Sequence, residues 1–138
     1  MNYITLNNGV KMPKAGLGTF LIPSEEIERT VITAYDMGYR LFDTAWRYNN
    51  EADIAKALKK HGVNREDIFI TTKLNIDALY YGGFHYGIKR LINIPCRTIK
   101  NAIEESFRNL QTEYIDLFFD PFSVANVYED VESPGRFL

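Results

Sequence analysis

The sequence has few of the features that mark secreted, membrane or nucleic-acid-binding proteins. It contains one cysteine, Cys96, which excludes an internal disulfide framework and fits a reducing compartment. No run approaches the roughly 20 apolar residues of a membrane span, and the opening residues lack the basic stretch and apolar core of a signal peptide. A net charge of -2 gives no basic field for nucleic acid. We therefore expect a cytoplasmic protein that binds neither membranes nor nucleic acid, and we predict no metal site.

The chain has the length and composition of one globular domain. It has 138 residues, of which 46% are hydrophobic and 25% charged, and no low-complexity linker divides it. Asn8 and Gly9 supply the positive-φ pair of a tight turn, which predicts an antiparallel hairpin within residues 1–13. Beyond it, short apolar runs alternate with helical patterns, which predicts an α/β fold with parallel strands. The expected strands lie at residues 15–20, 40–42, 68–72 and 114–119, with helices capped by Ser24 and Asn50 and a third helix from Pro95.

Two of the predicted strands run into a charged residue, Asp43 after the second and Lys73 after the third. In a parallel barrel the carboxyl ends of the strands line the mouth, where a charge stays solvated and meets substrate. Tyr48 lies in the loop above Asp43. A tyrosine hydroxyl ordinarily titrates near about 10, and a neighbouring ammonium paired with a carboxylate favours the phenolate. These three residues are therefore a candidate general acid with a charged pair behind it.

Four stretches in register resemble the aldo-keto reductases: Gly16-Leu-Gly-Thr-Phe20, the run from Gly38 to Glu51, Thr71-Thr-Lys-Leu74, and the run from Ser106 to Leu117. The resemblance implies an NAD(P)H-dependent carbonyl reductase on a TIM barrel, with NADP as cofactor and a small carbonyl compound as substrate. It makes Tyr48 the proton donor, with Lys73 and Asp43 as its tuning pair. It also implies that Gly18 and Thr19, beside Asp43, let a nicotinamide group lie against the backbone. Gly16 and Gly18 also allow the backbone of the first strand to be approached closely, and a turn is the alternative role of these two glycines.

A complete barrel of this kind needs about 250 residues, so we expect a half barrel of four parallel strands with flanking helices. Residues 74–94 read as a long aromatic loop, and residues 120–138 as an irregular tail. The resembling enzymes carry a histidine after the fourth strand, where this sequence has Phe119 or Pro121, depending on the alignment. Phosphate sites in such barrels are frequently built by the loops after strands seven and eight. The alternative function is therefore a non-catalytic module that binds itself or a partner.

An open parallel sheet needs a cover, because its outer strands present unpaired backbone groups and its inner face is apolar. Two copies paired by a twofold axis could supply the cover, which predicts a homo-oligomer. The aromatic residues 79–86 and the tail could instead fold over the opening. A third alternative is a chain of only marginal stability.

Overall fold

The computed structural model describes residues 2–73 and 99–119. Its centre is a four-stranded parallel sheet in the order β3 (Leu17–Gly18), β4 (Leu41–Asp43), β5 (Phe69–Lys73) and β6 (Leu117–Phe119). Each strand pairs with the next one along the chain, which is the arrangement of a partial barrel. The predicted α/β fold and its parallel strands are confirmed.

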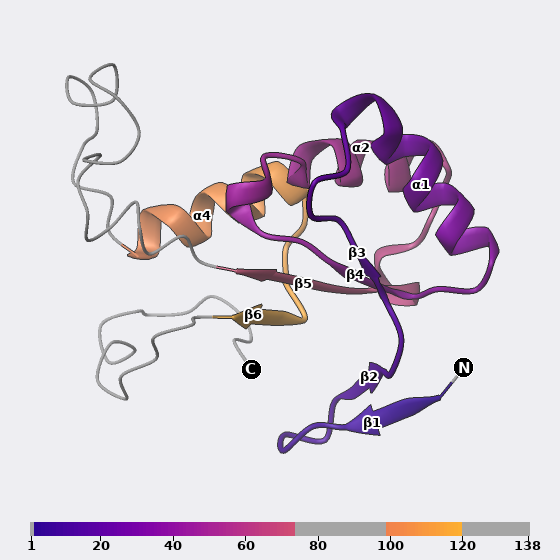
Figure 1. The fold of residues 1–138 in the computed structure, drawn as a ribbon. Helices are drawn as coiled ribbons and strands as arrows, with labels where there is room; N and C mark the ends of the chain where they lie inside the picture. The colour runs from indigo at the N-terminus through magenta and orange to yellow at the C-terminus, as the bar shows by residue number, and fades with distance from the viewer. Residues whose placement is uncertain (1, 74–98, 120–138) are drawn as a thin grey trace.

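Three helices cover one face of this sheet (Figure 1): α1 (Ser24–Asp36), α2 (Glu51–Lys60) and α4 (Ile99–Leu110). Because side chains alternate along a strand, Phe42 on β4 and Ile70 on β5, which are in register, point toward the helices. Both are almost completely buried, and Ile27, Val31 and Ile54 from α1 and α2 belong to the same core cluster. The hydrophobic core therefore lies between the sheet and the helices.

The opposite face of the sheet changes character along the strands. At the start of β4 and β5 it carries Leu41 and Phe69, which are in register and buried. At the carboxyl end it carries Asp43, Thr71 and Lys73. Polar side chains are thus gathered at one end of the sheet, as the sequence predicted for the ends of strands.

The N-terminal hairpin, β1 (Tyr3–Thr5) and β2 (Lys11–Pro13), is antiparallel and lies on the side of the sheet away from the helices (Figure 1). Its turn differs from the prediction, because Gly9 has a positive φ of 85° but Asn8 does not. The Asn8 side chain instead accepts the N–H of Val10 at 2.9 Å. The Gly9 N–H bonds to the carbonyl of Leu6 at 2.9 Å. The connection is therefore a three-residue loop that ends in a left-handed glycine.

Several predicted boundaries are wrong. The first strand covers only Leu17–Gly18 of the predicted residues 15–20, and the second and third strands begin and end one residue later than predicted. Two further differences have an identifiable reason. The fourth strand begins at Leu117 rather than at residue 114, because the carboxylate of Asp116 accepts the Ile70 N–H at 2.8 Å where a strand carbonyl would otherwise pair. The cap of α1 is Pro23 rather than Ser24, and no side chain bonds to the helix end there. Proline fits this position because its ring fixes φ, here at -60°.

The predicted aromatic loop at 74–94 and the tail at 120–138 lie outside the described residues, as do Pro95 and Cys96. Within the described part, two short 3₁₀ turns complete the fold, η1 (Trp46–Tyr48) after β4 and η2 (Arg65–Asp67) before β5. Among the helices described, none is both long enough and apolar enough to cross a membrane.

Candidate active site

The carboxyl ends of β4 and β5 bring an acidic and a basic side chain together. Lys73 Nζ lies 2.6 Å from Asp43 Oδ1 and 3.0 Å from the carbonyl oxygen of Thr44. The Thr71 hydroxyl donates to the same Asp43 oxygen at 2.5 Å. The side chains of Lys73 and Asp43 are 31% and 41% exposed, so the ion pair lies at the rim of the sheet and in reach of solvent.

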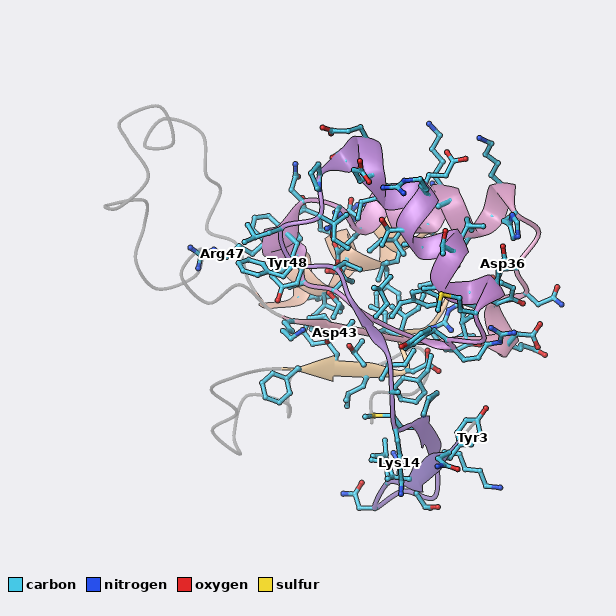
Figure 2. The ribbon with its side chains drawn as sticks, turned by 45° about the vertical axis from the view of Figure 1, so that its right-hand side comes forward. Tyr3, Lys14, Asp36, Asp43, Arg47 and Tyr48 are labelled. Carbon is cyan, nitrogen blue, oxygen red and sulfur yellow. The ribbon has the colours of Figure 1, made fainter. Side chains whose placement is uncertain are left out.

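Tyr48 lies beside this pair. It is the last residue of η1, and Asn49 ends that turn in a left-handed conformation with φ 57°. Lys73 Nζ is 5.6 Å from the centroid of the Tyr48 ring, within the range at which an aromatic face attracts a cation. The Phe20 ring packs against Tyr48 at a centroid distance of 4.9 Å. Figure 2 shows Asp43 and Tyr48 at the same end of the sheet, so the structure brings the three predicted residues together.

Gly18 and Thr19, the predicted cofactor contacts, occupy different environments. Thr19 is completely buried, and both its N–H and its hydroxyl donate to the carbonyl of Asp43, at 2.9 and 3.1 Å. Gly18 belongs to β3 rather than to a turn, and it is exposed in register with Asp43. A Cβ added at Gly18 would meet nothing within 4 Å. Thr19 thus joins two strands, while Gly18 borders open space; their contact with a cofactor stays a prediction.

Gly16 has a different role from Gly18, although both belong to the same motif. A Cβ at Gly16 would lie 2.5 Å from Cγ of Leu41, a distance that real side chains do not tolerate. Glycine is therefore needed at residue 16 for the close approach to β4, which confirms the predicted close backbone contact there. At Gly18 no such packing constraint exists.

The strand next to Lys73 ends in a phenylalanine. Phe119 of β6 is in register with Lys73, and it is 51% exposed. One of the two alignments considered for the missing histidine points to this position, and the other points to Pro121, which is outside the described residues. At Phe119 the side chain beside the ion pair is apolar and offers no hydrogen bond to a substrate.

Sequence reasoning missed Thr71, Thr44 and Phe20 as neighbours of the site. Thr71 could have been found, because it is two residues before Lys73 and the alternation along a strand places both on one face. The carbonyl of Thr44 and the ring of Phe20 reach the site through loop conformation, for which the sequence carries no comparable signal. Among residues 2–73 and 99–119, no group of three histidine, cysteine or acidic side chains is arranged to hold a metal ion.

The fold and the site define the chain as part of a parallel α/β barrel with a tyrosine, a lysine and an aspartate at its mouth. Comparison with known proteins supplies the family. Residues 14–130 match the aldo/keto reductase family, and the chain belongs to it. The resemblance that the sequence motifs carry is therefore confirmed.

Individual relatives match most of this chain. It is 41% identical over 116 residues to morphine 6-dehydrogenase of Pseudomonas putida, which covers 83% of this chain and 34% of the relative. It is 35% identical over 133 residues to the NADPH-dependent D-xylose reductase of Candida boidinii, a match that covers 94% of this chain and 37% of the relative. The solved structure of the aldose reductase from Schistosoma japonicum superposes with a TM-score of 0.65 at 35% sequence identity, and the match covers 86% of this chain and 36% of the aldose reductase chain. The chain thus spans little more than a third of the length of these relatives.

Proposed function

We propose that this chain acts in the NADPH-dependent reduction of an aldehyde or ketone to an alcohol, with Tyr48 as the proton donor. The observation that carries the proposal is the arrangement of Lys73. Its ammonium group is 2.6 Å from the carboxylate of Asp43 and 5.6 Å from the centre of the Tyr48 ring. An ammonium group held this close to the ring can balance the negative charge left on the tyrosine oxygen when the proton has been transferred.

Each residue of the trio has a separate task. The Tyr48 hydroxyl donates its proton to the carbonyl oxygen of the substrate while the carbonyl carbon is reduced, so the product is the alcohol. The Lys73 ammonium then balances the negative charge on the tyrosine oxygen. Asp43 holds Lys73 in place, with the Thr71 hydroxyl bound to the same carboxylate oxygen. General acid catalysis of this kind typically contributes about 10²–10⁴-fold to the rate.

NADPH would supply the hydride when bound. The open space at Gly18, on the strand beside Asp43, fits a flat ring that lies against the backbone. Thr19 supports this place from inside the protein, because its two bonds to the Asp43 carbonyl hold β3 against β4. The matched D-xylose reductase of Candida boidinii is named NADPH-dependent and that of Kluyveromyces lactis NAD(P)H-dependent, so both names support NADPH as a cofactor.

The test is cofactor binding followed by turnover. Trp46 is the only tryptophan of the sequence and lies two residues before Tyr48, so its fluorescence reports on the site. We expect NADPH to quench it with saturation below about 1 mM, the upper end of ordinary KM values. We expect Tyr48→Phe to bind NADPH as the wild type does and to lose reduction of a simple aldehyde. A chain that shows no saturation, or a variant with unchanged turnover, would contradict the proposal.

A second candidate is a non-catalytic module that associates with its own copies. The sheet favours this candidate, because β3 and β6 are the edge strands among those described, and each has a neighbouring strand on one side only. Rotation by half a turn about an axis along the strands would place β3 of one copy beside β6 of the other with all strands parallel. Phe119, half exposed on β6, would be covered in such an assembly.

Light scattering separates the two candidates. The self-associating module predicts a dimer at micromolar concentration, together with no effect of Tyr48→Phe on any activity. Replacing Phe119 with aspartate would then convert the dimer to a monomer. Met37→Asp, at an exposed apolar residue directly after α1 and away from both edge strands, serves as the comparison. A monomer that reduces an aldehyde would rule out this second candidate.

A further inference from the structure

Two adjacent polar residues at the start of α2 are buried beneath the site. Asn50 is 2% exposed and Glu51 is 1% exposed. Asn50 accepts a hydrogen bond from the Thr44 hydroxyl at 3.0 Å and donates one to the carbonyl of Thr19 at 2.9 Å. Thr19 directly follows β3 and Thr44 directly follows β4. Asn50 therefore joins the ends of two neighbouring strands.

Glu51 extends the same connection to the third strand. Its carboxylate accepts the Thr72 hydroxyl at 2.7 Å on one oxygen and the Asn109 side-chain amide at 3.0 Å on the other. Thr72 directly precedes Lys73, and Asn109 lies in the last turn of α4. Burial of a carboxylate is costly unless donors satisfy it, and here each oxygen has one. The start of α2 is thus bound to β5 and to α4.

A capping role does not account for these contacts. Asn50 occupies the N-cap position of α2, as the sequence predicted, but its side chain makes no capping bond to the helix. Its amide and the Glu51 carboxylate are directed instead toward residues at the ends of β3, β4 and β5. The two side chains contact neighbours of Asp43 and Lys73 rather than the trio itself.

We propose that Asn50 and Glu51 are positioning residues that set the spacing between Tyr48 and Lys73. Tyr48 is two residues before Asn50, and Lys73 is one residue after Thr72, so the 5.6 Å between the ammonium and the ring depends on these hydrogen bonds. The catalytic part of this inference rests on the proposed reductase function. A misplacement of about 1 Å by a change away from the reacting atoms can lower the rate about 100-fold.

The test exchanges a donor and an acceptor. Asn109→Asp places a second carboxylate against Glu51, which drives α4 and the start of α2 apart. Adding Glu51→Gln to that variant restores one donor and one acceptor, because the amide introduced at residue 51 donates to the carboxylate introduced at residue 109. Asn7→Asp makes the same substitution at an exposed position of the hairpin loop and is the matched control. Thr72→Val, which removes one donor to Glu51 without changing the side-chain shape, is a milder second probe.

The readout is the nuclear Overhauser cross-peak between the Tyr48 ring and the Lys73 side chain in the folded, cofactor-free chain. We expect Asn109→Asp and Thr72→Val to weaken it, the double variant to restore it, and Asn7→Asp to leave it unchanged. Turnover should follow the cross-peak, with kcat lowered up to about 100-fold and KM changed little. Should Asn109→Asp fail to fold, Thr72→Val and the double variant still test the positioning role by the same cross-peak.

Two results would overturn the positioning role: an unchanged cross-peak in folded Thr72→Val and Asn109→Asp, or a double variant that regains stability without regaining the cross-peak. The failure of the proposed function looks different, since it is the absence of NADPH binding and turnover in the wild type. The cross-peak is measured without cofactor, so it reports the spacing of Tyr48 and Lys73 in either case.

Discussion

The two glycines of the first strand motif provide a sharp test, because the structure assigns them different physical roles. A Cβ at Gly16 would lie 2.5, 2.7 and 2.8 Å from Cγ, Cδ2 and Cβ of Leu41. Carbon atoms in good contact are about 3.5–4.0 Å apart, so Leu41 would have to move by about 1 Å. A change of rotamer cannot relieve the contact with Cβ of Leu41, and β4 itself must shift. At Gly18 the added atom would meet nothing within 4 Å.

The expected magnitudes follow from this difference. Overpacking of a core position typically costs about 1–3 kcal/mol, and replacing glycine restricts the unfolded chain, which offsets about 0.4–1 kcal/mol. Gly16→Ala should therefore lower the free energy of unfolding by about 1–2 kcal/mol, or Tm by roughly 3–10 °C for a chain of this size. Gly18→Ala should keep or slightly raise stability, because only the unfolded-state contribution remains.

NADPH binding should be affected in the reverse order, more by Gly18→Ala than by Gly16→Ala. The methyl group of Gly18→Ala would project into the space proposed for the nicotinamide ring, so NADPH affinity should fall by about tenfold or more, equivalent to about 1.4 kcal/mol. Gly16→Ala should bind NADPH nearly normally at temperatures where it is folded. Urea denaturation and quenching of Trp46 measure the two effects on the same samples. Unchanged NADPH affinity in Gly18→Ala would refute the cofactor placement, and full stability of Gly16→Ala would refute the packing argument.

Three further predictions concern the site and its support. Asp43→Asn should change the free energy of unfolding by less than about 1 kcal/mol, because the side chains of Lys73 and Asp43 are 31% and 41% exposed. The same substitution should lower kcat in steady-state kinetics. A loss of stability with normal kcat would contradict the role assigned to Asp43. Lys73→Met should lower aldehyde reduction while far-ultraviolet circular dichroism stays unchanged, and retention of wild-type kcat would show that Tyr48 needs no ammonium neighbour. Arg65→Met should lower the free energy of unfolding by about 3 kcal/mol. The reason is that Arg65 donates hydrogen bonds to the Asp116 carboxylate at 2.6 Å and to the carbonyls of Ile68 and Tyr114 at 3.0 Å. A urea unfolding midpoint equal to that of the wild type would contradict this prediction.

The order of the strands and the trio could be predicted because both depend on patterns local to each strand. Asp43 and Lys73 end apolar runs, and parallel strands place such ends side by side. The details that could not be predicted depend on side chains that replace backbone partners. Asp116 takes the place of a strand carbonyl and delays β6, and the Asn8 side chain changes the hairpin turn. In both cases a polar side chain competes with the backbone for one hydrogen bond, and the sequence does not show which one prevails.

The same reasoning explains why the sequence marks Asn50 only as a helix cap and gives Glu51 no separate role. An asparagine before an acidic residue is a common N-terminal pattern, and the pattern is present here at α2. What distinguishes these residues is the position of their partners: Thr19 and Thr44 directly follow β3 and β4, Thr72 belongs to β5, and all three threonines are completely buried. A contact of this kind becomes visible only when the strands are assembled.

Within the part of the chain that the structure describes, the hydrogen bonds that hold the trio together come from residues 19–73. Lys73 is bound to Asp43 and Thr44, and Asp43 accepts from Thr71 and Thr19. No hydrogen bond described for these three residues comes from β6 or α4, which reach the site only indirectly, through Asn109 and Glu51. From these contacts we expect the spacing of Tyr48 and Lys73 to be independent of whatever covers the open side of the sheet. It follows that the Tyr48–Lys73 spacing should survive dilution to a monomer even if cofactor affinity does not, and the two properties can be measured separately on one sample.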